Sequence, residues 1–357
     1  MDSNNQMNSE SKKSALSIDI GYGNTKAVWN QKKTPGKPDT WSEICFRSVT
    51  LGVVVDTGTS LSSLDRVIVN VGTDSFYVGP KATFEGGTRA LHPDYINTVE
   101  HEALLCGAWH YMWRNTGQVT KSVDILVLGL PVSGFQANRR RLQELGSKVH
   151  RVPVPLELRQ RYGRDYEDVV AKKVLVLPQP MGSLRLASEH ERDYDLFDDG
   201  IVSMVIDVGY NTLDWFLADG MTPQFELCGS FSGGFSQVLK AVSRQIGFDH
   251  GVGSQNFGLV ERGLESGEMN FGFKKIQMQQ YQLLARKVAD GAISDLLQQF
   301  DPHRAGVARI YLTGGGAAAY KDSLQARLPD HSIEMMEDGV MANARGYYMS
   351  GLDSFAD

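Results

Sequence analysis

One short pattern occurs twice in this chain and constrains its fold more than any other sequence feature. Residues 18–26 read Ile-Asp-Ile-Gly-Tyr-Gly-Asn-Thr-Lys, and residues 206–214 read Ile-Asp-Val-Gly-Tyr-Asn-Thr-Leu-Asp. Each segment is typical of a strand, a tight turn and a second strand, because glycine and asparagine favour turns between apolar runs. The two hairpins lie 188 positions apart. They predict a duplicated architecture in which each half of the chain begins with the same unit.

Length and composition agree with a two-part globular protein. The chain has 357 residues, whereas a single domain usually has about 100–200. Hydrophobic residues make up 41% and charged residues 22%, as in ordinary globular proteins. Apolar strand-like runs such as residues 123–132 and 309–313 alternate with helical patterns at 98–115, 275–300 and 317–328. This alternation predicts a mixed α/β fold.

Charge and cysteine usage exclude several classes of partner. A formal net charge of −6 gives no overall electrostatic reason to expect direct binding to nucleic acid. The three cysteines, Cys45, Cys106 and Cys228, lie far apart without metal-site spacing. The first fourteen residues are polar, without the apolar segment of a secretory signal. No apolar run approaches the roughly 20 residues that span a bilayer. We therefore expect a cytoplasmic protein without a membrane partner.

The first hairpin carries the residue types that bind phosphate. Gly21 and Gly23 allow the main chain to approach phosphate oxygens closely, because no Cβ intervenes. The next three residues, 24–26, are Asn-Thr-Lys and can add two side-chain donors and a positive charge. Asp19 ends the preceding strand and suits Mg²⁺, which is held by one or two carboxylates together with substrate phosphates. A plain β-turn is the alternative interpretation.

Two further segments repeat this chemistry. Asp207 is followed by Gly209, Asn211, Thr212 and Asp214, so a second carboxylate could face the first across one Mg²⁺–phosphate group. Residues 314–317 read Gly-Gly-Gly-Ala after an apolar strand, and a nucleotide could pack against this side-chain-free backbone where a helix begins. A turn and a flexible loop are the alternatives here. Neither the Rossmann nor the P-loop glycine pattern accompanies these segments.

Taken together, the motifs resemble those of the superfamily of actins, sugar kinases and heat-shock chaperones. The resemblance rests on Ile18-Asp-x-Gly with Lys26, on Asp207-x-Gly-x-x-Thr and on Leu312-x-Gly-Gly-Gly-Ala. Residues 207–214 are most similar to plasmid-segregation actins of the ParM/StbA type and to archaeal-type actins. The Ala342-Asn-Ala-Arg-Gly segment also resembles that group. Protein D of the PRTRC plasmid gene cluster is another plausible relative.

The resemblance implies two RNase H-like lobes with the nucleotide in the cleft between them. Residues 1–14 are then a flexible tail, 15–180 an N-terminal lobe and 181–357 a C-terminal lobe whose terminal helix packs back on the first. It also implies a slow ATP hydrolase that binds ATP, or GTP, with Mg²⁺. Such a protein polymerises with itself into filaments, and an adaptor protein that binds DNA would connect the filaments to plasmid segregation.

The resemblance further assigns roles to particular residues. Asp19 and Asp207 would hold the metal and contribute to catalysis, and Gln179 would orient the attacking water, since positioning is most of what phosphoryl transfer requires. A bulky Tyr210 replaces the small glycine of ParM-type proteins. The residues expected to bind the nucleotide are Gly21, Tyr22, Gly23, Asn24, Thr25, Lys26, Gly209, Tyr210, Asn211, Thr212, Gly233, Gly234, Gln237, Lys240, Gly314, Gly315, Gly316 and Ala317.

Two other functions remain open at this level. A nucleotide-binding adaptor or scaffold that hydrolyses ATP poorly and does not polymerise would carry the same motifs. A small-molecule kinase of the same superfamily would also need a hydroxyl-binding site with a general-base aspartate, which the sequence does not identify.

Overall fold

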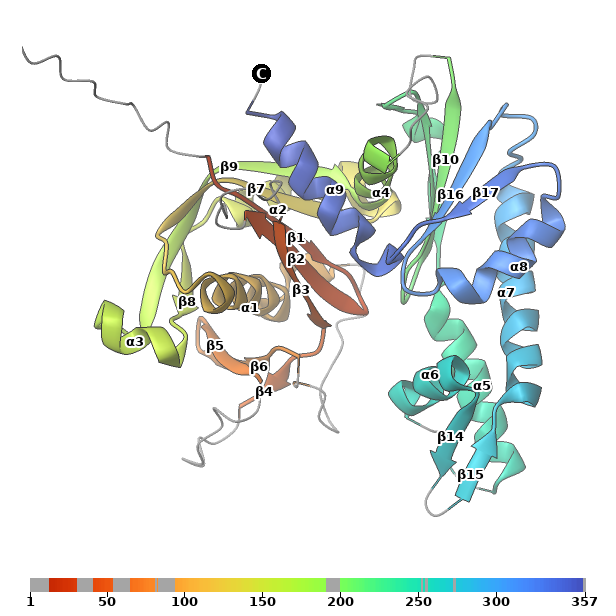
Figure 1. Cartoon of the computed structure of the whole chain (residues 1–357), viewed down its shortest axis with the longest axis horizontal. Helices are drawn as coiled ribbons and strands as arrows, with labels where there is room; N and C mark the ends of the chain where they lie inside the picture. The colour runs from red at the N-terminus through yellow and green to blue at the C-terminus, as the bar shows by residue number, and fades with distance from the viewer. Residues whose placement is uncertain are drawn as a thin grey trace, which may run out of the picture.

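The computed structural model describes residues 13–30, 41–53, 65–80, 82, 94–190, 200–251, 253, 256–271 and 274–355. Residues 1–12, most of the predicted tail, lie outside this part of the chain. Two mixed β-sheets, one from each half of the sequence, stand side by side with helices around and between them (Figure 1).

The first half forms a sheet with the strand order β3-β2-β1-β7-β9-β8. β1 pairs antiparallel with β2 and parallel with β7, and β7 pairs parallel with β9. A small sheet of β4, β6 and β5 lies beside it. The elements are β1 (Ala15–Ile20), β2 (Asn24–Asn30), β3 (Trp41–Arg47), β4 (Leu51–Gly52), β5 (Val67–Val71), β6 (Asp74–Val78), α1 (Val99–Thr116), β7 (Ser122–Leu130), α2 (Phe135–Gly146), β8 (His150–Pro153), α3 (Leu156–Tyr162) and β9 (Tyr166–Pro178).

The second half repeats this pairing with the order β12-β11-β10-β16-β17. β10 pairs antiparallel with β11 and parallel with β16, as β1 does with β2 and β7. The predicted mixed α/β fold with two similar lobes is therefore confirmed. The elements are α4 (Gln179–His190), β10 (Val202–Val208), β11 (Leu213–Asp219), β12 (Thr222–Pro223), β13 (Gly229–Phe231), α5 (Phe235–Asp249), α6 (Phe257–Ser266), β14 (Glu268–Phe271), β15 (Lys274–Gln277), α7 (Gln279–Gln299), β16 (Arg309–Thr313), α8 (Ala317–Arg327), β17 (Ser332–Met335) and α9 (Gly339–Asp353).

Side-chain alternation along β1 and β10 decides where the two key carboxylates point. On β1, Leu16 and Ile18 pack into the core that contains α1, while Ala15 packs with α9. Asp19 lies four residues after Ala15 on the same strand, so its side chain points to the same face, which adjoins α9. On β10, Ile206 packs into the core of α5, α7 and α8, whereas Val205 packs with α4 and α9. Asp207 shares the face of Val205, so both carboxylates lie on the sheet faces that adjoin α4 and α9.

Helices α4 and α9 cross between the two sheets (Figure 1). α4 follows β9 of the first sheet, and α9 follows β17 of the second but contacts β1, β2 and β7. The crossing is close because both helices carry glycine there: a Cβ on Gly346 would lie 1.7 Å from the carbonyl oxygen of Gly182. Ser17 on β1 also donates a hydrogen bond to the carbonyl of Ala344, 2.7 Å away. These contacts fix α9 against the first sheet.

Local details differ from the sequence predictions at two places. The helix predicted from residue 275 begins at Gln279, because residues 274–277 pair with β14 as the strand β15. Ser14, the last residue of the predicted tail, is anchored: its backbone N–H and its hydroxyl lie 2.7 and 2.9 Å from Asp124 Oδ2. None of the helices in the described part of the chain is long and apolar enough to span a membrane.

Candidate functional site

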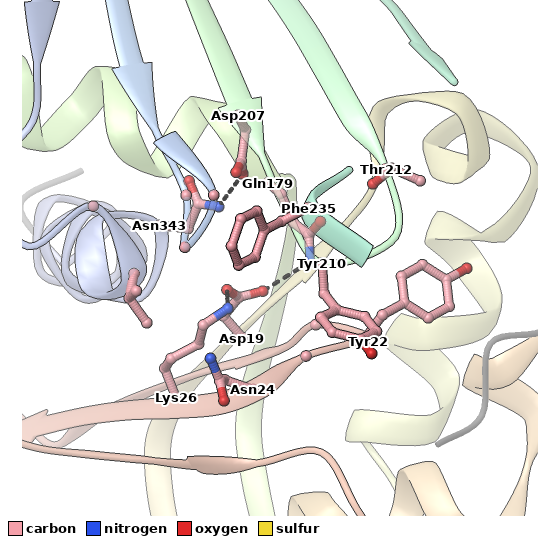
Figure 2. A pocket seen from close by; sticks show the side chains of 18 of the residues that line it. Asp19, Tyr22, Asn24, Lys26, Gln179, Asp207, Tyr210, Thr212, Phe235 and Asn343 are labelled. Carbon is pink, nitrogen blue, oxygen red and sulfur yellow. Dashed lines mark hydrogen bonds and ion pairs between the residues drawn. The ribbon is translucent and has the colours of Figure 1, made fainter. Parts of the chain in front are cut away.

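An ion pair joins the two strands of the first hairpin beside its turn. Asp19 and Lys26 face each other across β1 and β2, and Lys26 Nζ lies 2.7 Å from Asp19 Oδ2. Gln179, the first residue of α4, donates from Nε2 to Asp19 Oδ1 at 2.8 Å. Burial lowers the pKa of Lys26, but the Asp19 carboxylate outweighs this effect and raises the pKa overall. Lys26 is therefore charged and aimed at the space between the lobes (Figure 2).

The second hairpin has the same geometry as the first. In the first hairpin the backbone N–H of Gly21 donates to the carbonyl of Asn24, and in the second the N–H of Gly209 donates to that of Thr212. Asp207 faces Asp214 across β10 and β11, as Asp19 faces Lys26. By these contacts Asn24 is equivalent to Thr212, and Lys26 is equivalent to Asp214.

The two hairpins differ in charge at this equivalent position. Asp214 is buried, and among the described residues its Oδ1 has no hydrogen-bond partner. Burial and then the nearby Asp207 raise the pKa of Asp214 to about 7. Burial also raises the pKa of Asp207, against the hydrogen bond from Asn343. One side of the cleft therefore presents the Asp19–Lys26 ion pair and the other a pair of buried carboxyl groups.

The hairpins touch each other through Tyr210. A Cβ on Gly23 would lie only 2.8 Å from Cβ of Tyr210. Tyr210, the bulky residue that departs from the ParM-type pattern, therefore packs against Gly23 of the first hairpin, which has no side chain; Figure 2 shows Tyr210 in the cleft. Any larger residue than glycine at position 23 would push the hairpins apart.

The triple-glycine segment lies directly against the second hairpin. Gly314 has a φ of +91°, which favours glycine, and its Cβ would lie 2.4 Å from Asp207 Oδ1. The N–H of Gly316 donates to the carbonyl of Val208. A Cβ on Gly315 would meet only Val340, 3.6 Å away. Gly315 is therefore the glycine of this segment that leaves open space beside the cleft.

The amide groups at the start of α5 are used within the protein. The N–H of Gly234 donates to the carbonyl of Asn211, and that of Phe235 donates to Gly209. Gly233 N–H bonds within its own loop, and its carbonyl accepts from Tyr320 Oη. Gly233 and Gly234 were expected to bind the nucleotide. In the structure they support the second hairpin instead, because helix α5 begins against its turn.

Most of the predicted residues come together in one cleft, lined from both lobes. Those that line it are Asp19, Gly21, Tyr22, Gly23, Asn24, Lys26, Gln179, Asp207, Gly209, Tyr210, Thr212, Gly314, Gly315 and Gly316.

The remaining predicted residues do not line the cleft. Thr25 is buried and its hydroxyl lies 2.9 Å from that of Ser48. Asn211 contributes its carbonyl to α5, as described above. Gln237 is half-buried and Lys240 is exposed on α5, and Ala317 is buried at the start of α8. Gly233 and Gly234 complete this group.

Several lining residues were not among the predicted site residues. Asn343 on α9 donates to Asp207 Oδ2 at 2.7 Å. Arg47 on β3 and Glu261 on α6 lie 2.7 Å apart across the cleft. The only sequence signal for Asn343 was its place in the Ala342-Asn-Ala-Arg-Gly segment. The full set of additional lining residues is Arg47, Asp214, Phe235, Glu261, Gly339, Val340 and Asn343.

Two family models match the chain, one in each half. The model of the N-terminal domain of actin-like proteins matches residues 17–182. The model of the C-terminal domain of archaeal MreB-like actin homologues matches residues 205–326. The matched ranges include both hairpins and the triple glycine. The chain belongs to the actin-like proteins.

Solved structures share the two-lobe fold of this actin-like protein. The archaeal actin homologue Ta0583 has a TM-score of 0.74 at 20% identity, over 95% of this chain and 99% of that one. ParM from a 15-stranded Clostridium botulinum filament has a TM-score of 0.70 at 17% identity, over 96% and 99%. Bacillus thuringiensis ParM with ATP has a TM-score of 0.66 at 13% identity, over 97% of this chain and 100% of that one. A search of curated proteins found no match. The expected actin-like fold is confirmed.

Proposed function

We propose that this actin-like protein binds ATP with Mg²⁺ in the cleft and hydrolyses it slowly while it polymerises into filaments. The observation that carries the proposal is the convergence of two equivalent hairpins and a triple-glycine segment on one cleft. Among similar structures, Bacillus thuringiensis ParM was solved with ATP, and Clostridium botulinum ParM as a filament. Plasmid segregation through an adaptor that binds DNA is the cellular role we propose for the filament.

The residues of the cleft suit a magnesium–nucleotide complex. Asp19 and Asp207 would supply carboxylate oxygens, the ligands that Mg²⁺ prefers, and both side chains line the cleft. No group of three or more His, Cys, Asp or Glu side chains in the described ranges is arranged to hold a metal ion. Mg²⁺ is commonly held by one or two carboxylates, substrate phosphates and several waters, and this is the ligand set that we propose here. When bound, it would neutralise charge on the β- and γ-phosphates.

The protein's own contribution to hydrolysis would be positioning and electrostatics. Lys26, released from Asp19, would offer its charge to a phosphate oxygen. Gln179 anchors its Nε2 on Asp19, which leaves its side-chain carbonyl oxygen able to accept a hydrogen bond from the attacking water. An amide is not a strong base, so Gln179 would orient the water rather than deprotonate it. The Gly21 and Gly209 turns would bring backbone close to the phosphates.

Sedimentation after addition of ATP and Mg²⁺ tests the proposal. We expect protein in the pellet above a critical concentration, with ADP release that follows polymer formation. Protein that binds nucleotide but stays monomeric at every concentration would favour the adaptor or scaffold alternative. ADP release that depends on an added sugar or pantothenate-like acceptor would favour the kinase. GTP in place of ATP in the same assay determines which nucleotide is preferred.

A further inference from the structure

Asn343 is held on both sides of its amide. Its Nδ2 lies 2.7 Å from Asp207 Oδ2, and its Oδ1 accepts a hydrogen bond of 2.6 Å from the hydroxyl of Ser183 on α4. Asn343 and Asp207 are each 6% exposed, and Ser183 is fully buried. Buried hydrogen bonds to a charged group are among the stronger polar contacts in proteins. Asn343 thus connects the Asp207 carboxylate to the helix that enters from the other lobe.

The amide of Asn343 has one consistent orientation. An ionised carboxylate can only accept, so the side facing Asp207 must be the Nδ2 donor. The opposite side is then Oδ1, which needs a donor, and Ser183 supplies one. Ser183 Oγ also lies 3.2 Å from the Thr313 hydroxyl, which donates to the carbonyl of Gly339. Turning the amide over would place Oδ1 against the Asp207 carboxylate, which has no hydrogen to donate, so the observed orientation is fixed from the Asp207 side.

The close crossing of α4 and α9 makes these contacts possible. A Cβ on Gly182 would lie 2.4 Å from the backbone oxygen of Asn343. Because no side chain separates the two backbones, Ser183 and Asn343 come within hydrogen-bond distance. The carboxylate of the second lobe is therefore positioned by the same crossing that joins the lobes.

We propose that Asn343 is a positioning residue: it holds Asp207 Oδ2 and so fixes the orientation in which the Asp207 carboxylate lines the cleft, available to Mg²⁺ or its water. This inference rests on the proposed function, because it concerns the magnesium–nucleotide complex of the same cleft. Figure 2 shows Asn343 on α9 with its hydrogen bond to Asp207, and Asp19 and Lys26 on the hairpin of the other lobe. Partners that orient a metal ligand typically change metal affinity about 10–100-fold when they are removed.

Binding of the fluorescent nucleotide mant-ATP, titrated with Mg²⁺ and with EDTA, tests this role. The measured quantity is the ratio of the dissociation constants in EDTA and in Mg²⁺. We expect Asn343→Ala to reduce this ratio by about 10-fold or more, with little change in the EDTA value. Ser183→Ala should reduce it in the same direction but less, because Asn343 loses only its orienting donor. Ser323→Ala, which removes another buried helical serine far along the chain on α8, is the matched control and should keep the wild-type ratio.

The outcomes separate this inference from the proposed function. A wild-type protein that binds no mant-ATP, or binds it without any Mg²⁺ effect, contradicts the proposed function and this inference with it. Wild-type binding that Mg²⁺ strengthens, with an unchanged ratio in Asn343→Ala, overturns the inference alone. An equal loss of affinity in both conditions does the same, because it indicates a purely structural role. If Asn343→Ala does not fold, an unchanged ratio in Ser183→Ala is the contradicting result.

Discussion

Arg47 and Glu261 form an ion pair of 2.7 Å that joins the two lobes at the cleft. Arg47 ends β3 and Glu261 lies on α6. Their side chains are 28% and 18% exposed, so water screens the pair only partly. Both residues line the cleft. The ion pair is therefore part of the wall of the cleft in which we propose that the nucleotide binds.

Neutralising this pair should speed nucleotide release. Glu261→Gln keeps the size of the side chain and removes its charge. We expect release of mant-ATP to become faster, by up to about fivefold, since ion pairs of this exposure contribute at most about 1 kcal/mol. The measurement is stopped-flow dissociation at low and high salt, and the difference should shrink at high salt. Glu265→Gln, an exposed residue on the same helix, is the control. Equal release rates in all three proteins at low salt would contradict the role.

Removing Asp207 should separate hydrolysis from binding. Asp207→Ala deletes a proposed metal carboxylate but leaves both glycine turns and Lys26 in place. We expect ATP turnover to fall at least about 100-fold, because a direct ligand matters no less than the partners that orient it. Some nucleotide binding should persist in a mant-ATP titration. Asp322→Ala, an exposed position on α8, controls for loss of negative charge. Normal turnover by Asp207→Ala is the result that removes it from the mechanism.

The helix crossing should not tolerate any side chain at position 346. A Cβ there would lie 1.7 Å from a backbone oxygen, which cannot rotate away. We expect Gly346→Ala to lower the free energy of unfolding by about 3 kcal/mol or to prevent folding, at or beyond the usual range for overpacking. Gly291→Ala on α7 is the contrasting variant, because nothing lies within 4 Å of its Cβ position. It should stabilise the protein by about 0.5–1 kcal/mol. Urea denaturation measures both, and similar effects of the two changes would refute the argument.

Stability should depend on pH through Asp214. Its pKa is about 7 in the folded protein, against about 3.9 when unfolded. The folded state therefore binds this proton more tightly, and the stabilisation is complete below about pH 4 and is lost as pH rises to 7. Asp214→Asn removes this loss. As pH rises across that window, the free energy of unfolding of the variant should therefore increase relative to that of the wild type by up to about 1.4 kcal/mol per pH unit. Urea denaturation of nucleotide-free protein in EDTA between pH 5 and 8 measures it. Parallel pH profiles for the two proteins would show that Asp214 titrates normally.

Local sequence patterns were sufficient for the hairpins and the glycine segment. A strand that ends in Asp-x-Gly already determines where its carboxylate and its turn lie, so Asp19 and Asp207 could be selected without knowledge of the fold. The same holds for Gly314, where the glycine follows an apolar strand directly. Repetition of the pattern also predicted two similar lobes, since equal units tend to form equal sheets.

Residues brought together by tertiary contacts could not be selected in this way. Asn343 gains its role from the crossing of α4 and α9, and Arg47 from an α6 residue more than half the chain away. Gly234 is the opposite case. It was expected to bind the nucleotide, but its backbone N–H is already bonded to the carbonyl of Asn211, a tertiary contact that the sequence pattern does not reveal. The strand at residues 274–277 was missed because its polar sequence runs straight into α7 and resembles helix.

Lys26 in the first hairpin and Asp214 in the second occupy equivalent positions but differ in charge, and this difference affects the direction in which a polyphosphate would bind. Two identical hairpins would form a symmetric clamp, into which a polyphosphate chain could enter with either end first. An ion pair of Asp19 with Lys26 on one side and two buried carboxyl groups on the other make the halves of the clamp unequal. A bound polyphosphate would then have a single favoured orientation, with its most negative portion nearest Lys26. The charge difference between Lys26 and Asp214 would thus be enough to give the clamp a polarity.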